Sequence, residues 1–209
     1  MMDHLASSAR RGARVAVTCP DLTSAVMRGT PDRMQRFVAD AAAAATGGDI
    51  VLVGFSGAGV LLPNIAAELA ERVAVTVFVD AVVPPARGHH RLDARFTEFV
   101  DSQTVDGVLA LWLDWWPDEI ARMLPEASLR DQIAADMPRV PREFYNETLD
   151  VPVGWVESDC RYLQLSPAYD ADRVRAQTYG WPTATVDGTH LSIVTDPVGV
   201  SAAISRLAS

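Results

Sequence analysis

The stretch DIVLVGFSGAG, from Asp49 to Gly59, constrains the fold of this chain more than any other. Residues 50–53 are a short, continuous run of mostly β-branched side chains, which is the pattern of a strand buried on both faces of a parallel sheet. A helical spacing of apolar residues then covers 60–72. Ser56 therefore lies in a sharp turn between a strand and a helix, where we expect its hydroxyl to be exposed.

This turn has the pattern Gly-x-Ser-x-Gly, with Ala58 in the last position. Small residues on either side of the serine, at Gly54 and Ala58, allow the strand and the helix to approach closely. The backbone N–H of Gly57, at the start of the helix, is expected to point to where an oxyanion would form. The pattern predicts that Ser56 is a nucleophile, and the alternative is an ordinary Gly/Ser turn.

Strands alternate with helices over most of the chain, and hairpin signals are absent from these parts. The alternation predicts an α/β fold with a mostly parallel sheet that is flanked by helices. The length of 209 residues suits a single domain, 1–209. Strands are expected over 13–18, 50–53, 73–79, 160–165 and 183–186. Helices are expected over 3–11, 31–46, 60–72, 169–178 and 197–207. Thr30 is the expected N-cap of the second helix, and Gly47 and Gly48 are expected to end it.

The alternation stops between about residue 86 and residue 150. Helical pieces without strand spacing are expected there, over 92–100, 105–115, 118–124, 129–137 and 142–145. Trp112, Trp115 and Trp116 crowd together close to Leu109. This insertion is either a helical lid over an apolar site or a satellite core of its own.

Charge and residue usage exclude several classes of function. The net charge of −9 argues against binding to nucleic acid, which requires clustered cationic side chains. Lysine is absent, so Schiff-base chemistry and a phosphate-loop lysine are excluded. The adjacent His89 and His90 lack a third ligand at a metal-binding spacing and are expected in a solvated loop. We therefore expect neither a metal nor a cofactor.

The cysteines and the hydropathy of the chain predict the cellular compartment in which the protein is found. Cys19 and Cys160 each adjoin an apolar run, so two buried free thiols are expected instead of a disulfide. The sequence contains no apolar run long enough to span a bilayer, and residues 1–12 lack the apolar segment of a signal peptide. We expect a cytoplasmic protein that does not bind membranes.

A histidine follows the last predicted strand, in the segment Asp187-Gly188-Thr189-His190. Ligands of an open parallel sheet bind at the carboxyl ends of its strands, and Ser56 and His190 both follow such ends. We therefore predict that His190 is the base that acts on Ser56. The alternative is a solvated surface histidine.

Together these features resemble the α/β-hydrolase superfamily. More narrowly, the segments GFSGAG, LLPNIA, FVDAVVPP, YLQLSPAYDADRVRAQTYGWP and GTHLSIVTDP resemble a group of small actinobacterial α/β-hydrolase-like proteins. The similarity covers nearly all of the chain from Gly12 onward. It implies a hydrolase scaffold with a serine, a histidine and an acid, although a fold does not by itself imply a function.

The resemblance offers two locations for the acid. The usual one is the loop before the histidine strand, where the first carboxylates are Asp170 and Asp172, already inside a predicted helix. The other is the end of the strand after the nucleophile, where Asp80 lies in the segment FVDA. Asp80 is our first choice and Asp170 is the reserve; the alternative for Asp80 is a carboxylate that caps the following segment.

The resemblance also implies further strands at the start of the sheet and a loop that supplies a second oxyanion donor. Residues 1–11 correspond to the helix after that loop, so we expect a truncated α/β-hydrolase sheet without the oxyanion loop. A backbone group near Asp21 and Leu22, or at Ala81, is the expected replacement donor. An unpaired sheet edge favours pairing, which makes a homodimer the expected assembly.

The leading hypothesis is a serine hydrolase that acts on a small-molecule ester, thioester or lactone. One alternative is a non-hydrolytic cyclase, epimerase or lyase of secondary metabolism that uses His190 as its base, and another is a non-catalytic pseudo-hydrolase. In the leading hypothesis Ser56 attacks, His190 transfers the proton, Asp80 orients the imidazole and Gly57 binds the oxyanion. The residues expected to bind an apolar or aromatic acyl group are Phe55, Leu109, Trp112, Trp115 and Trp116.

Overall fold

The computed structural model describes residues 16–27, 33–45, 49–146 and 148–209. They form two compact units, of which the first contains residues 38–90 and 149–209 together with the segment up to Pro20. The second unit contains residues 21–37 and 91–148. Most of the segment expected to be an insertion belongs to this second unit, and its role as a lid stays a prediction.

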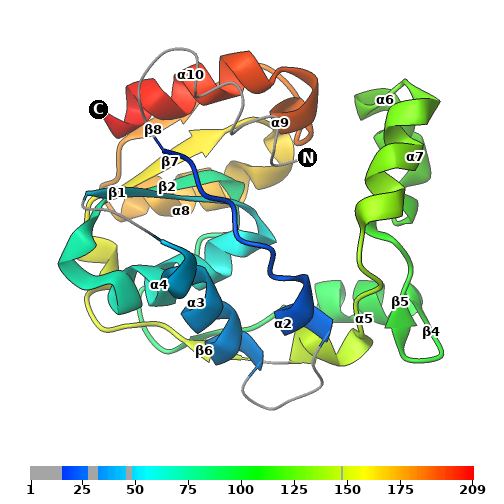
Figure 1. The fold of residues 1–209 in the computed structure, drawn as a ribbon, viewed down its shortest axis with the longest axis horizontal. Coiled ribbons are helices and arrows are strands. Elements are labelled where there is room, and N and C mark those ends of the chain that lie inside the picture. The colour runs from blue at the N-terminus through cyan, green and yellow to red at the C-terminus, as the bar shows by residue number, and fades with distance from the viewer. Residues whose placement is uncertain (1–15, 28–32, 46–48, 147) are drawn as a thin grey trace. The chain divides into compact units, whose positions relative to one another are not determined.

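A four-stranded parallel sheet forms the centre of the first unit (Figure 1). Its order is β1-β2-β7-β8, and every neighbouring pair is parallel. Helical segments connect β1 to β2 and β7 to β8, as parallel neighbours require. The predicted α/β fold with a parallel sheet is thus confirmed. The strands are β1 (Ile50–Ser56), β2 (Val73–Ala81), β7 (Cys160–Gln164) and β8 (Thr183–Thr185).

Helices cover both faces of this sheet (Figure 1). Helix α10 (Pro197–Ala208) packs on the face that carries Val75, Val77 and Val79. Helices α4 (Leu62–Leu69) and α8 (Asp170–Thr178) pack on the opposite face, which carries Phe78 and Tyr162. Because successive side chains of a strand point to opposite faces, β2 is buried on both sides and forms the centre of the core.

The burial predicted on both faces of the strand that leads to Ser56 is wrong, because β1 lies at an edge of the four described strands and is partly exposed. The side chains of Val51 and Val53 are 44% and 40% exposed. A continuous apolar run indicates a strand, but it does not specify that the strand has neighbours on both sides. The strand predicted over 13–18 is also wrong in its described part, because residues 16–18 have no strand structure.

The other helices of the first unit follow the predicted positions with altered boundaries. The helix expected over 60–72 is divided into the 3-10 segment η1 (Gly57–Leu61), α4, and the 3-10 segment η2 (Ala70–Arg72). The predicted helix 3–11, the N-cap Thr30 and the stop at Gly47 and Gly48 lie outside the described residues. Further helical elements of this unit are most of α3 (Arg33–Ala44), η5 (Trp155–Glu157), η6 (Pro167–Tyr169) and α9 (Ser192–Thr195), whereas α2 (Thr23–Met27) belongs to the second unit.

The two adjacent histidines form a short strand instead of a solvated loop. Strand β3 (His89–His90) pairs in the antiparallel sense with β6 (Leu149–Asp150). His89 remains largely exposed, and its Nδ1 lies 3.8 Å from a carboxylate oxygen of Asp150. His90 is partly buried, and burial, together with the nearby charge of Arg175, lowers its pKa.

The second unit is mostly helical but contains a hairpin where a helix was expected. Strands β4 (Thr104–Val105) and β5 (Val108–Leu109) pair across Asp106 and Gly107, whose φ angles are 51° and 76°. Two left-handed residues of the type Asp-Gly are the signature of a tight hairpin turn, so the helix predicted over 105–115 is wrong. The remaining elements are α5 (Ala94–Ser102), η3 (Trp112–Asp114), α6 (Pro117–Met123), α7 (Ala127–Asp136) and η4 (Arg142–Asn146).

Aromatic side chains form the core of this second unit. Leu109 and Trp115 are buried, and the Trp115 indole N–H donates to the carbonyl of Ala110 at 3.0 Å. Trp116 stacks on Phe99 at a centroid distance of 5.0 Å. These contacts give the tryptophans a packing role within the unit, and their role in binding substrate stays a prediction.

The two cysteines differ from each other in exposure. Neither forms a disulfide, but only Cys160 is buried, and Cys19 is exposed. Burial raises the pKa of the Cys160 thiol to about 12. The prediction of two buried thiols is therefore wrong for Cys19. Separately, none of the described helices has the length and hydropathy of a membrane span.

Candidate active site

Ser56 ends β1 in a strained backbone conformation, with φ 56° and ψ −130°. This region of φ and ψ is almost confined to glycine, and a non-glycine residue held there points to a functional constraint. Two glycines make the turn possible. A Cβ at Gly54 would lie 2.7 Å from the Leu62 side chain, and a Cβ at Gly59 would lie 2.1 Å from the Val82 carbonyl oxygen. After the serine, the close approach is at Gly59, which is buried, whereas Ala58 is exposed.

Asp80 lies at the same carboxyl edge of the sheet as Ser56, because β2 has a bulge next to Ser56. Phe55 pairs with Val79, but Ser56 pairs with Ala81, so Asp80 is the extra residue. Its φ of 42° is also left-handed. A bulge re-aims the side chain of its extra residue, and here it places a carboxylate in the interior of the first unit.

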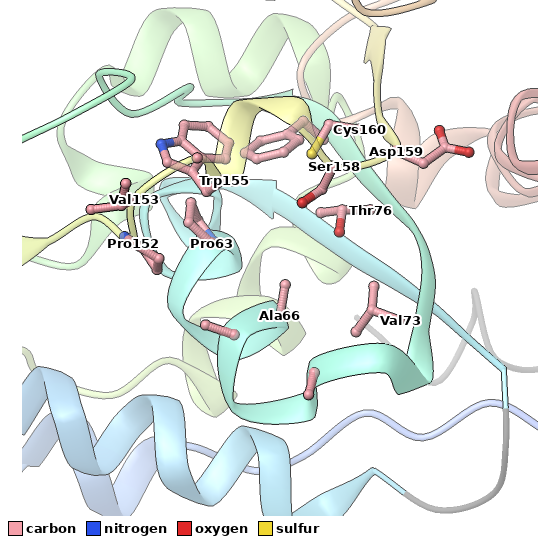
Figure 2. A pocket seen from close by; sticks show the side chains of 14 residues that line it. Pro63, Ala66, Val73, Thr76, Pro152, Val153, Trp155, Ser158, Asp159 and Cys160 are labelled. Atoms are coloured by element: carbon pink, nitrogen blue, oxygen red, sulfur yellow. The ribbon is translucent and has the colours of Figure 1, made fainter.

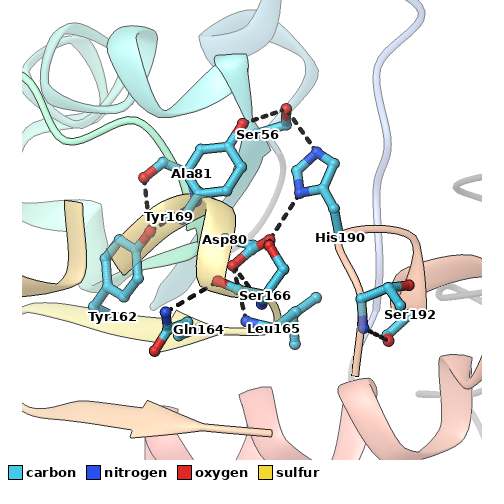
Figure 3. A network of polar contacts seen from close by, with 11 residues as sticks. Ser56, Asp80, Ala81, Tyr162, Gln164, Leu165, Ser166, Tyr169, His190 and Ser192 are labelled. Atoms are coloured by element: carbon cyan, nitrogen blue, oxygen red, sulfur yellow. Dashed lines mark hydrogen bonds and ion pairs between the residues drawn. The ribbon is translucent and has the colours of Figure 1, made fainter. Parts of the chain in front are cut away.

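The Asp80 carboxylate is fully buried and accepts four hydrogen bonds. The backbone N–H groups of Leu165 and Ser166 donate to Oδ1 at 2.9 and 3.0 Å. The Ser166 hydroxyl donates to Oδ2 at 2.6 Å (Figure 3). Burial of a carboxylate is unfavourable without such partners, so these bonds stabilise its charged form and fix its orientation.

His190 lies in the loop between β8 and α9. Hydrogen bonds to Ser192 stabilise the conformation of this loop. The Ser192 hydroxyl oxygen accepts from the Thr189 N–H at 2.8 Å, and the Ser192 N–H donates to the Thr189 carbonyl at 2.9 Å. Gly188 allows this packing, because a Cβ there would lie 2.3 Å from the Ser192 hydroxyl oxygen. The loop thereby directs a buried imidazole toward the ends of β1 and β2.

The structure brings Ser56, His190 and Asp80 together (Figure 3). His190 Nδ1 lies 2.8 Å from Asp80 Oδ2, and His190 Nε2 lies 3.0 Å from Ser56 Oγ. This is the order of carboxylate, imidazole and hydroxyl that allows a serine to act as a nucleophile. The residues come from the ends of β1 and β2 and from the loop after β8.

Two aromatic rings stack on the imidazole of His190. Phe55 lies at a centroid distance of 4.5 Å and Tyr169 at 4.9 Å, with interplanar angles of 21° and 17°. The Tyr169 hydroxyl also lies 3.1 Å from Ser56 Oγ. Tyr169 was not among the predicted site residues, although it directly precedes Asp170 in the loop where the usual acid was expected. The only signal was the placement of this loop at a strand end.

The reserve carboxylate lies further from the imidazole in the same hydrogen-bond network, because the Gln164 amide that bonds to it also donates to the Ser166 carbonyl at 3.0 Å. Asp170 is the first residue of α8, and its Oδ1 accepts from the side-chain amide of Gln164 at 2.5 Å. The same oxygen lies 3.9 Å from a guanidinium nitrogen of Arg173. Of the two candidate acids, Asp80 is the one that contacts His190.

The backbone N–H groups near Ser56 differ in whether they already donate to another residue. Gly57 is the first residue of η1, and the first N–H groups of a helix have no partner within that helix. The N–H of Ala81, an expected replacement donor, instead donates to the Tyr162 hydroxyl at 3.1 Å, and that hydroxyl donates to the Ala81 carbonyl at 3.0 Å. Burial and the nearby carboxylates of Asp172 and Asp80 raise the pKa of Tyr162, so its hydroxyl keeps the proton that it donates.

A separate pocket of about 290 Å³ lies at the amino ends of the strands (Figure 2). Val73 and Cys160, the first residues of β2 and β7, line it together with residues of α4 and the segment 152–159. The candidate site is at the carboxyl ends, so this pocket does not contain Ser56, Asp80 or His190. Within the described ranges, no three His, Cys, Asp or Glu side chains form a group that could hold a metal ion.

Comparison with known proteins agrees with this architecture. The alpha/beta hydrolase family matches residues 1–203, and the chain therefore belongs to that family. No curated protein matches the chain. The predicted superfamily is thereby confirmed.

Similar solved structures cover nearly the whole chain. One is an extracellular α/β-hydrolase from a Paenibacillus species, which is described as homologous in structure and function to tobacco salicylic acid binding protein 2. It has a TM-score of 0.72 at 16% identity, and the match covers 98% of this chain and 92% of that one. A polyneuridine aldehyde esterase has a TM-score of 0.61 at 15% identity, over 96% and 90% of the two chains. A variant of a pyrethroid hydrolase has a TM-score of 0.64 at 20% identity, over 99% and 90%. At these identities the likeness shows the fold alone.

Proposed function

We propose that this protein is a serine hydrolase that cleaves a small-molecule carboxylic ester, thioester or lactone. The observation that carries the proposal is the continuous set of hydrogen bonds from Asp80 through His190 to Ser56. Membership of the alpha/beta hydrolase family and the likeness to esterases and hydrolases support a hydrolase-type function. The triad and the substrate class are our own inference from the site.

The hydrogen bonds define the proton positions before the reaction. A carboxylate accepts hydrogen bonds only, so His190 Nδ1 carries a proton and donates it to Asp80 Oδ2. Nε2 of the neutral imidazole then has a lone pair, and the Ser56 hydroxyl donates to it at 3.0 Å. The imidazole is therefore in the tautomer that can accept the serine proton.

The first step is attack of Ser56 Oγ on the substrate carbonyl carbon, while its proton moves to His190 Nε2. The buried carboxylate of Asp80 stabilises the imidazolium that results. The backbone N–H of Gly57 would donate to the oxyanion, because it lies at the start of η1 directly after the nucleophile. His190 then returns its proton to the leaving alkoxide or thiolate, and water releases the acyl group in the same way.

The proposed substrate has an apolar or aromatic acyl group. Phe55 supports this choice within the first unit, because its ring lies against His190 at the candidate site. The substrate contacts predicted for Leu109, Trp112, Trp115 and Trp116 also stay part of the proposal, although these residues belong to the aromatic core of the second unit. We propose that the reaction uses neither a metal nor a cofactor.

The decisive experiment combines a fluorophosphonate probe with a panel of acyl esters of different chain lengths. Stoichiometric labelling of Ser56, located by mass spectrometry, supports an activated serine. Ser56→Ala should lower kcat by a factor on the order of 10⁶, because the nucleophile is lost. The matched control is Ser205→Ala in α10, which removes an exposed hydroxyl bonded only within its own helix, to the Ser201 carbonyl.

The outcomes separate the proposal from its two alternatives. Ester turnover that persists in Ser56→Ala would contradict the role of the serine. Absence of labelling, combined with His190-dependent proton exchange into a bound ligand, would favour a cyclase, epimerase or lyase. Absence of labelling and of exchange would favour a pseudo-hydrolase.

A further inference from the structure

The Tyr169 side chain contacts both Ser56 and His190. It ends η6, the turn between β7 and α8, and so lies at the carboxyl rim of the sheet with the other three residues. Its hydroxyl lies 3.1 Å from Ser56 Oγ, and its ring lies almost parallel to the imidazole, at 17° (Figure 3). Attack by Ser56 with His190 as the base leaves this residue without a role.

The direction of the hydrogen bond follows from the proton positions. Ser56 has one hydroxyl proton, and this proton is directed to His190 Nε2, which has a lone pair and no proton. The Ser56 oxygen can therefore act toward Tyr169 only as an acceptor. The Tyr169 hydroxyl consequently donates to the nucleophilic oxygen.

We propose that Tyr169 is a catalytic residue whose hydroxyl donates to Ser56 Oγ before attack and to the substrate oxyanion after it. The proposal rests on the proposed function. The two oxygens are bonded to the same carbon in the tetrahedral intermediate, so a donor within 3.1 Å of one is close to the other. Tyr169 would thus complete an oxyanion site with the Gly57 N–H, while the Ala81 N–H is bonded to Tyr162.

Tyr169 donates a hydrogen bond in this mechanism and does not transfer its proton. As the bond between Oγ and the carbonyl carbon forms, the serine proton moves to His190 Nε2, and the π electrons of the carbonyl move to its oxygen. The negative oxygen accepts from Gly57 and from Tyr169. On collapse the carbonyl re-forms, the bond to the leaving group breaks, and His190 protonates the leaving oxygen or sulfur.

The ring of Tyr169 fixes the position of its hydroxyl. Stacking on His190 leaves the phenol few orientations, so the donor is in place before the substrate binds. A donor that is oriented in advance stabilises developing charge without reorganisation during the reaction. The ring and the hydroxyl therefore have separate contributions, which two substitutions can distinguish.

The central test is Tyr169→Phe, which removes the hydroxyl and keeps the ring. Loss of one oxyanion donor lowers kcat by about 10²- to 10³-fold, and we expect a decrease in this range with KM little changed. The rate of Ser56 labelling by the fluorophosphonate should decrease in parallel. The matched control is Tyr179→Phe, which removes a hydroxyl from the end of α8 that is bonded to the Pro84 carbonyl at 3.3 Å, away from the triad. This control should retain wild-type activity.

Two further measurements separate catalysis from a structural role. Inhibition by an alkyl boronic acid, which forms a tetrahedral adduct on an active serine, should weaken in Tyr169→Phe by a factor similar to the decrease in kcat. The pH at which kcat/KM reaches half its maximum should stay unchanged in Tyr169→Phe, because the stacked ring remains. Tyr169→Leu removes the ring as well and should shift this pH.

The results distinguish failure of this proposal from failure of the proposed function. If wild type labels at Ser56 and Tyr169→Phe equals Tyr179→Phe in kcat and boronate affinity, the hydroxyl is not a catalytic donor. If kcat decreases but boronate affinity does not, the hydroxyl only positions other groups, and the proposal is also overturned. If wild type neither labels nor hydrolyses any ester, the proposed function fails, and this proposal fails with it.

Discussion

Ser56 and Asp80 lie at the carboxyl ends of neighbouring parallel strands, and both have left-handed backbone angles, with φ of 56° and 42°. For residues with a Cβ, such conformations cost on the order of 1–3 kcal/mol each. Both strained residues contact the same imidazole. The fold thus holds unfavourable backbone geometry at the two positions that present the hydroxyl and the carboxylate to His190.

The strain at Ser56 predicts a gain in stability when the serine is replaced by glycine. Glycine accepts φ 56° and ψ −130° without a steric penalty, whereas alanine retains the Cβ. The free energy of unfolding should therefore be about 1 kcal/mol higher for Ser56→Gly than for Ser56→Ala. Urea denaturation of the two inactive variants measures this difference. Equal stabilities would mean that the turn is not strained.

The contacts of the two carboxylates predict which one supports catalysis. Asp80→Asn keeps the shape of the side chain but favours the wrong imidazole tautomer, so kcat should decrease by about 10⁴-fold. Asp170→Asn is the matched control, because Asp170 is bonded to Gln164 and Arg173, and it should retain wild-type kcat. Steady-state ester hydrolysis by the two variants distinguishes them. The reverse ranking would assign the role to Asp170.

The close approach of Gly59 predicts a position that does not tolerate a methyl group. A Cβ at Gly59 would lie 2.1 Å from the backbone carbonyl of Val82, and a backbone atom cannot move aside easily. Gly59→Ala should lower the free energy of unfolding by about 1–3 kcal/mol, as overpacking does. Gly57→Ala is the control, because no atom lies within 4 Å of its Cβ position. Thermal unfolding of both variants compares them, and a Gly59→Ala variant as stable as Gly57→Ala would contradict the geometry.

The proximity of Ser56, Asp80 and His190 could be predicted from the sequence because each follows a strand. In a parallel sheet the carboxyl ends of the strands meet at one edge, so a strand pattern is enough to place residues that follow it. Their side-chain roles remain proposals. The edge position of β1 could not be predicted, since a run such as 50–53 specifies a strand but not its neighbours.

Features that depend on a single turn were missed. The hairpin at Asp106 and Gly107 has a local signal, the Asp-Gly pair, but the apolar residues after it also fit the spacing of a helix. Tyr169 has no such signal, because its contact with Ser56 depends on the path of η6, 113 residues further along the chain. Sequence patterns specify elements, whereas contacts of this kind depend on how the elements pack.

The difference in burial between the two thiols predicts different reactivity toward Ellman's reagent. Cys160 is buried and its pKa is raised to about 12, so it lacks both access and thiolate at pH 8. Cys19 is exposed and should react rapidly. We expect one thiol to react in the native protein and two in 6 M guanidinium chloride. Cys19→Ser should abolish the rapid reaction, and rapid reaction of Cys160 in that variant would contradict its burial.

Asp172 predicts a pH dependence of stability with a defined sign. Burial raises the pKa of its carboxyl above the ordinary value of 3.8, although the Val83 N–H and Arg175 partly oppose this effect. The folded state therefore holds the proton more tightly than the unfolded state, so this contribution to stability is present at low pH. It is lost as the pH rises from about 3.8 through the raised pKa of the folded state.

Asp172→Asn isolates this contribution, because the amide oxygen can still accept from the Val83 N–H, which lies 2.7 Å from Asp172 Oδ1 in the wild type. Urea denaturation of both proteins from pH 3.5 to pH 7 gives the difference in the free energy of unfolding, variant minus wild type. This difference should increase with pH above 3.8 and become constant once the folded carboxyl is ionised, since only the wild type has a charge to bury. A difference that decreases over this range would mean that the Val83 N–H and Arg175 stabilise the carboxylate more than burial destabilises it.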